Sequence, residues 1–100
     1  MKSLNHNDGK LRPSLVLRDM PYAWEQLLKA REEGARKYAR DNWALSKGQP
    51  EAKDWLGDNA DSVMRHIMAI ERGEQTDTES GLSHWAHVAC RALMALEYEG

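Results

Sequence analysis

The sequence predicts an all-α fold: a small bundle of three main helices plus a short helix, completed by oligomerisation. Three segments carry apolar residues at intervals of three and four, which is the helical period. Each segment has residues that typically start or stop a helix, and strand-like alternation is scarce. A chain of 100 residues buries only a small core, so association with a second copy would add to it. We therefore expect a homo-oligomer.

The first long helix is expected to begin near Asp19, a good N-cap, with Pro21 in the first turn, where its missing N–H costs nothing. Its apolar stripe consists of Met20, Trp24, Leu27, Leu28, Ala35 and Tyr38. The opposite face carries charged pairs at i,i+4 spacing and is expected to be solvated: Glu25 with Lys29, Glu32 with Arg36, and Glu33 with Lys37.

The segments that flank this helix differ from it in composition. Residues 1–12 are polar and contain Asn-Asp-Gly, so they predict an N-terminal arm, followed by a single helical domain over residues 13–100. Residues 42–58 are interrupted by Gly48, Pro50 and Gly57, which predicts a loop or lid. Pro50 can open a short helix that runs to Trp55.

A second helix is expected over residues 59–72, ending at Gly73. Its inner face would hold Ala60, Val63, Met64, Ile67 and Met68. The third helix is expected over residues 82–98, with Ser80 or Ser83 as its cap. This helix is apolar on more than one side, so it should lie centrally in the bundle or in an oligomer interface.

Charge and composition exclude several classes of function. The net charge of −2 provides no positive field that would recruit duplex DNA. No apolar run approaches the roughly 18 residues that span a bilayer, and the first residues lack the apolar core of a secretory signal. A single cysteine, Cys90, cannot form an intrachain disulfide. We therefore expect no nucleic-acid partner, no membrane contact and a cytoplasmic location.

The segment with the most chemical potential is residues 73–87. It contains five possible metal ligands, Glu74, Asp77, Glu79, His84 and His87. Carboxylate oxygens are the ligands that Mg²⁺ and Mn²⁺ prefer. If the second and third helices pack antiparallel, His66 would face the same cleft. The alternative is structural: acids favour the N-terminal end of a helix, and each histidine can serve as an ordinary hydrogen-bond partner.

A second group of residues suits a nucleotide. Lys37 and Arg36 offer cations for phosphates. Asn42 can hydrogen-bond a base edge, and Tyr38 or Trp43 can stack on a ring. The structural alternative is that Lys37 complements the helix dipole and that Tyr38 continues the apolar stripe.

Six short blocks occur in an order that resembles the phage dATP/dGTP diphosphohydrolase family, which is related in function to MazG-like pyrophosphohydrolases. The blocks are Gly9–Arg12, Gly34–Tyr38, Asn42-Trp43, Arg65-His66, Gly73–Gly81 and His84–His87. One feature departs from the all-α pyrophosphohydrolases, because Arg36 stands where a third acid would follow Glu32 and Glu33.

The resemblance implies a helical enzyme that cleaves purine deoxynucleoside triphosphates to monophosphate and pyrophosphate with Mg²⁺ or Mn²⁺, adjusting nucleotide pools in the cytoplasm of an infected cell. It implies three sets of residues. The metal ligands would be Glu74, Asp77 and Glu79. The catalytic residues would be His66, Glu79, His84 and His87. The nucleotide-binding residues would be Lys37, Tyr38, Asn42, Trp43 and Arg65.

Two other functions fit the same sequence. A non-catalytic nucleotide-binding protein, such as a phage sponge against a nucleotide signal used in host defence, would use the cations and aromatic rings without a metal. A helical protein-interaction module would use the four tryptophans and the broad apolar third helix. Turnover would distinguish the enzyme from the sponge, and nucleotide binding would distinguish both from the module.

Overall fold

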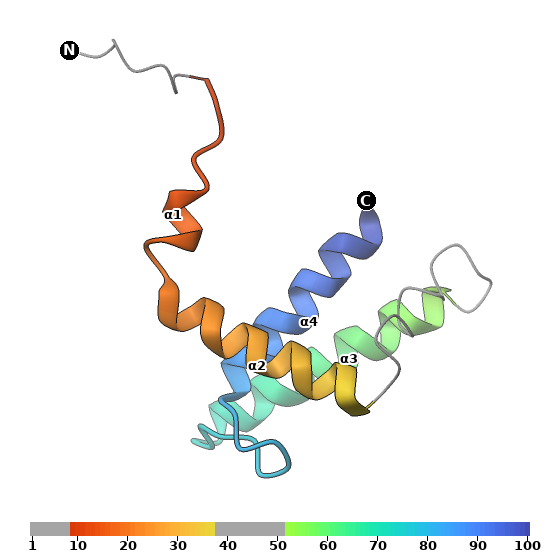
Figure 1. Cartoon of the computed structure of the whole chain (residues 1–100). Coiled ribbons are helices and arrows are strands. Elements are labelled where there is room, and N and C mark those ends of the chain that lie inside the picture. The colour runs from red at the N-terminus through yellow and green to blue at the C-terminus, as the bar shows by residue number, and fades with distance from the viewer. Residues whose placement is uncertain (1–8, 38–51) are drawn as a thin grey trace.

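The computed structural model describes residues 9–37 and 52–100, and these residues form four helices and no strand. The helices are α1 (Ser14–Leu17), α2 (Pro21–Lys37), α3 (Ala52–Glu71) and α4 (His84–Glu99). Figure 1 shows that α2, α3 and α4 form the body of the bundle, with α1 at the N-terminal end of α2. The all-α class with three main helices and a short one is therefore confirmed.

The starts of α2 and α4 follow the sequence signals closely. α2 begins at Pro21, within two residues of the expected Asp19 cap. α4 begins at His84 and is capped by Ser83, whose side-chain oxygen accepts a hydrogen bond of 3.0 Å from the backbone N–H of Trp85. A serine at this position satisfies one of the helix's unpaired N–H groups.

The start of α3 differs from the prediction. Residues 52–58 were expected in a loop or short helix, but they are the first two turns of α3, which begins seven residues before the expected Asn59. Gly57 lies inside the helix and does not end it, because a glycine in a helix costs only about 1 kcal/mol relative to alanine. The short helix in the structure is α1, in a segment where the sequence predicted no helix. The remaining part of the predicted lid, residues 42–51, lies outside the described residues.

α4 packs against both α2 and α3, as the sequence suggested for a centrally placed helix. The buried hydrophobic residues in the described part of the chain are small: Ala30, Ala69, Ala86 and Cys90. Ala30 of α2 meets Ala86 and Cys90 of α4, so small side chains let these two helices approach closely. Leu82 and Met94 pack against this cluster.

The face of α3 that packs inward is more polar than the sequence predicted. Met64 and Met68 were expected inside but are more than half exposed, at 54% and 59%. The buried positions include Asn59, whose side-chain amide donates to the carbonyl oxygen of Arg91 over 3.1 Å. The Arg91 guanidinium donates to Asn59 Oδ1 over 3.3 Å. Polar contacts between α3 and α4 therefore replace part of the expected apolar packing.

The connection between α3 and α4 is a tight, hydrogen-bonded turn. Gly73 ends α3 with a positive φ of 90°, and the next N–H, of Glu74, donates to the carbonyl of Ala69 over 2.9 Å. This is the usual geometry of a helix C-terminus, where glycine adopts the left-handed conformation without strain. Thr76 and Ser83 then form an isolated antiparallel bridge. The connection is thus held in one shape beside the start of α4.

None of the helices among the described residues combines the length and the apolar composition that a membrane-spanning segment needs. Residues 1–8 of the predicted N-terminal arm lie outside the described residues, so the proposed division at residue 12 stays a prediction.

Candidate functional site

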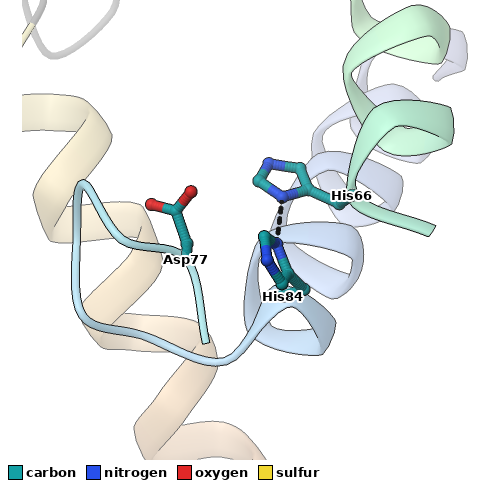
Figure 2. Close-up of side chains that lie close together, drawn as sticks. All are labelled: His66, Asp77 and His84. Atoms are coloured by element: carbon teal, nitrogen blue, oxygen red, sulfur yellow. Dashed lines mark hydrogen bonds between the residues drawn. The ribbon is translucent and has the colours of Figure 1, made fainter. Parts of the chain in front are cut away.

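Three polar side chains from different segments meet where α3 ends and α4 begins. His66 comes from α3, Asp77 from the connection and His84 from the first position of α4. One potential ligand atom from each lies within 4.8 Å of the other two. Figure 2 shows the His66 and His84 rings meeting at their edges, joined by a hydrogen bond, with the Asp77 carboxylate to one side. We call the wider group the polar corner; it consists of His66, Glu74, Asp77, Ser80, His84 and His87.

The contact between the two histidines constrains where their protons lie. His66 Nδ1 and His84 Nδ1 are 2.8 Å apart, so in the neutral rings one nitrogen donates and the other accepts. Glu74 Oε1 lies 2.8 Å from His84 Nε2 and, as a carboxylate, can only accept. This assigns the hydrogen of His84 to Nε2 and leaves a lone pair on its Nδ1. His66 then donates from Nδ1 to that lone pair.

His87 joins the corner through Ser80. The Ser80 hydroxyl accepts a hydrogen bond from the Leu82 N–H over 3.1 Å, and its own hydrogen is available to His87 Nε2 at 2.7 Å. The His87 ring stacks on the His66 ring, with centroids 4.8 Å apart and planes 6° from parallel. His66 therefore contacts one histidine edge to edge and the other face to face.

Burial keeps two of these histidines neutral. Burial is the largest cause that lowers the pKa of His66 below its usual value, and the nearby His87 and His84 lower it further. Burial also lowers the pKa of His87, with Asp77 partly opposing the shift. Both rings are therefore uncharged at pH 7, and a neutral imidazole can accept a proton or bind a metal ion.

Asp77 is held as an oriented carboxylate. Burial by itself would raise the pKa of Asp77, but hydrogen bonds from Ser80 outweigh it and, with His87, lower the pKa. The Ser80 N–H donates to Asp77 Oδ2 over 2.8 Å, and His87 Nε2 lies 3.8 Å from the same oxygen. The ionised side chain is thus fixed toward the two histidines.

An open hollow adjoins the polar corner. It is lined by Lys29, Glu32, Glu33, Arg36, Ser80 and Leu82, so one wall comes from α2 and the other from the connection. Arg36 forms an ion pair with Glu33. The α2 face that the sequence predicted as solvated therefore borders this hollow, and Ser80 is the residue shared between hollow and corner.

The structure brings together most of the predicted catalytic and metal-binding residues. His66 contacts both His84 and His87, Asp77 lies beside them, and Glu74 contacts the far side of the His84 ring. Glu79 lies exposed in the connection, and Arg65 lies exposed on α3. The close ligand group pairs Asp77 with two histidines, whereas the predicted metal set paired it with Glu74 and Glu79.

Most of the predicted nucleotide-binding residues lie outside the description. Tyr38, Asn42 and Trp43 are not among the described residues, and of Lys37 only the backbone, at the end of α2, is described. Their expected role stays a prediction.

The sequence reasoning missed Ser80 and Lys29 as possible functional residues. The sequence indicates Ser80 only as a possible helix cap, although an aspartate side chain often closes a turn by accepting from a backbone N–H a few residues later, as Asp77 does from Ser80. Lys29 was placed on a solvated face, and no local pattern indicates that the α3–α4 connection lies opposite it.

The donor set of the corner fits a divalent metal ion. His66 and His84 offer ring nitrogens and Asp77 offers a carboxylate oxygen, a combination found in catalytic metal sites that keep further positions open. A metal ion there would supply positive charge to a phosphate oxygen.

Two comparisons with known proteins found similarity to one family. The family model described as dATP/dGTP diphosphohydrolase, N-terminal, matches residues 2–100. A dATP/dGTP diphosphohydrolase from Salmonella phage PMBT28 is 30% identical over 89 residues, which are 89% of this chain and 27% of that protein. The chain thus spans about a quarter of the length of this relative. No solved structure matches the chain.

Proposed function

Because this chain belongs to the dATP/dGTP diphosphohydrolase family, we propose that it hydrolyses purine deoxynucleoside triphosphates to monophosphate and pyrophosphate with a divalent metal ion, Mg²⁺ or Mn²⁺. The proposed role is to adjust nucleotide pools during phage infection, in the cytoplasm of the host cell. The relative's name and source support this proposal.

One observation carries the proposal: a hollow lined by Lys29, Arg36 and two glutamates, Glu32 and Glu33, borders the corner that holds the neutral His66 and His87 and the ionised Asp77. Lys29 and Arg36 line the hollow from α2, and a triphosphate needs positive charge of this kind beside it. Ser80 lines the same hollow and hydrogen-bonds both His87 and Asp77. A phosphate chain in the hollow would therefore end next to the corner.

The residues of the hollow and of the polar corner have distinct roles in the proposed reaction. Arg36 and Lys29 bind phosphate oxygens, and Asp77 and the histidines orient the water that attacks phosphorus. A neutral histidine can accept the proton that this water loses as the anhydride between the α- and β-phosphates breaks. The metal ion, when bound, would stabilise the negative charge on the phosphate oxygens. The proposed reaction depends on positioning of the water and on stabilisation of the phosphate charge, and it forms no covalent enzyme intermediate.

We also propose that the chain forms a homo-oligomer. The described buried hydrophobics are all small, and many large apolar side chains are exposed, including Trp85 at 58% and Leu96 at 63%. A contiguous exposed apolar surface typically marks an interaction site. The same surface favours the second candidate function, a helical protein-interaction module, and nucleotide binding distinguishes the two.

The decisive experiment incubates the purified chain with each of the four deoxynucleoside triphosphates and Mg²⁺ or Mn²⁺, and follows monophosphate and pyrophosphate. We expect turnover of the purine substrates. Asp77→Asn should lower kcat by about 100-fold or more, since it removes a charge at the reacting centre. Arg36→Ala should raise KM about tenfold, since its cation meets substrate charge in the ground state.

Arg18→Ala is the matched control, because Arg18 is an exposed arginine at the end of α1 and away from the hollow. It should leave kcat and KM unchanged. Tight purine-nucleotide binding without turnover would indicate that the chain is a nucleotide sponge and not an enzyme. No nucleotide binding at all would leave the interaction module.

A further inference from the structure

We propose that His66, Asp77 and His84 bind a divalent transition-metal ion that accepts nitrogen ligands, such as Zn²⁺, in preference to Mg²⁺, and that Glu74 is a positioning residue for His84. The three ligand atoms lie within 4.8 Å of one another. The inference does not rest on the proposed hydrolysis, because metal binding is measured without a nucleotide.

The first argument is the chemistry of the donors. Two of the three ligand atoms are imidazole nitrogens. Mg²⁺ prefers oxygen ligands and retains several bound waters, so a site with two nitrogen ligands disfavours Mg²⁺. Zn²⁺, Co²⁺ and related ions bind imidazole well, and two histidines with one carboxylate leave positions open for water or a phosphate oxygen.

The second argument is the convergence of the two rings. His66 Nδ1 and His84 Nδ1 face each other across 2.8 Å, with one hydrogen between them. If His66 moves that hydrogen to its Nε2, both Nδ1 lone pairs point at one place and each ring keeps a single hydrogen. Two nitrogens bound to one tetrahedral ion at about 2.1 Å lie about 3.4 Å apart. Metal binding would therefore require the two nitrogens to separate by about 0.6 Å and the two rings to tilt until both lone pairs point at the ion.

The third argument concerns Glu74. A metal-bound histidine almost always donates its other N–H to a carboxylate, a backbone carbonyl or water, which fixes its tautomer and strengthens it as a ligand. Glu74 Oε1 already lies 2.8 Å from His84 Nε2. Its carboxylate therefore directs the His84 Nδ1 lone pair toward His66. Glu74 acts on the metal through His84, in place of the direct ligation that the sequence predicted.

The test titrates the chelator-treated full chain with ZnCl₂, CoCl₂ and MgCl₂ by calorimetry. We expect one Zn²⁺ per chain, bound at least about 100-fold more tightly than Mg²⁺. The Co²⁺ complex should show the intense visible absorption of a four-coordinate site. Equal or tighter Mg²⁺ binding, or no saturable Zn²⁺ binding, would overturn the proposal.

Variants assign the ligands. His84→Ala and His66→Gln should each weaken Zn²⁺ binding by about 100-fold. His66 is the less buried of the two, so its variant tests the site even if loss of the buried His84 unfolds the chain. Unchanged Zn²⁺ affinity in a folded variant of either histidine would overturn the proposal.

Glu74→Gln tests the positioning role. It should weaken Zn²⁺ binding by about tenfold and alter the Co²⁺ absorption spectrum, because a neutral amide leaves the His84 imidazole a weaker metal ligand than the carboxylate does. Glu71→Gln, the same substitution at an exposed position at the end of α3, should change neither property. An unaltered spectrum and affinity in Glu74→Gln would remove Glu74 from the site.

The two proposals can fail separately. Tight Zn²⁺ binding without nucleotide hydrolysis would overturn the proposed function and leave this site intact. Hydrolysis with Mg²⁺ by a chain that binds no Zn²⁺ would overturn this site and leave the proposed function intact.

Discussion

The polar corner and the outer face of α4 share a helix but are built in opposite ways. In the corner, His84 is 3% exposed and both its ring nitrogens have hydrogen-bond partners. The neighbouring residue, Trp85, is 58% exposed. It begins a stripe of exposed apolar residues at helical spacing, which we call the outer stripe: Trp85, Ala89, Ala92 and Leu96.

This difference separates the region that one chain stabilises by its own contacts from the region that depends on a second molecule. The corner is organised within one chain, because its members come from α3, the connection and α4 and satisfy one another. The outer stripe is apolar surface that a second molecule can bury. Since the described apolar core is small, hydrogen bonds in the corner should contribute a large part of the chain's own stability, and the stripe should contribute through association.

The largest expected effect is the contrast between His84→Ala and Trp85→Ala. His84→Ala removes a buried ring and leaves the His66 and Glu74 groups without their partner, which costs about 2–4 kcal/mol of the free energy of unfolding. Trp85→Ala removes a half-exposed ring and should cost less than about 1 kcal/mol in a dilute monomer. Urea denaturation with a chelator present measures both values.

Equal losses in the free energy of unfolding for His84→Ala and Trp85→Ala at every protein concentration would contradict this comparison. A cost for Trp85→Ala that grows with protein concentration would instead locate the outer stripe in an interface, because association stabilises the folded state by mass action.

A smaller effect is expected from Leu96→Glu in the outer stripe. If a second copy covers the stripe, a carboxylate there is buried without a partner and should weaken association by about tenfold or more, equivalent to about 1.4 kcal/mol. Sedimentation velocity over a concentration series measures this change. Glu74→Gln, a change in the corner, is the control and should leave the sedimentation unchanged. A wild-type chain that stays monomeric at all concentrations would contradict the assignment of the stripe.

The sequence predicted the helices well where their signals are local. Pro21 and Ser83 mark helix starts through groups within the first turn, and Gly73 marks an end through its own backbone conformation. The start of α3 was wrong because Gly57 was taken as a break, whereas neighbouring turns stabilise a helix enough to include one glycine.

The site was predictable in part for a similar reason. His84 and His87 lie one turn apart on a helix, so their common face follows from the sequence. The contact of His66 with both depends on how α3 packs on α4, and antiparallel packing of these helices was only a condition of that expectation. The role of Ser80 and the position of Lys29 depend on side-chain geometry and on the crossing of α2, for which one sequence contains no local signal.

The smallest expected effects come from substitutions of two glycines, one at the start of the connection and one inside helix α2. Gly73 has a positive φ of 90°, which an alanine adopts only with strain, so Gly73→Ala should lower the free energy of unfolding by about 1 kcal/mol. Gly34 lies inside α2, and a Cβ built there meets no atom within 4 Å. Gly34→Ala should therefore raise the free energy of unfolding by about 0.4–1 kcal/mol.

Both values come from the same urea denaturation assay, and their opposite signs make the comparison independent of a general effect of adding a methyl group. The Gly73 substitution should also weaken Zn²⁺ binding, because Glu74 and Asp77 follow the turn that Gly73 begins. A stabilising Gly73→Ala with unchanged Zn²⁺ affinity would show that the connection does not hold the corner in place, and the self-contained corner would lose its structural basis.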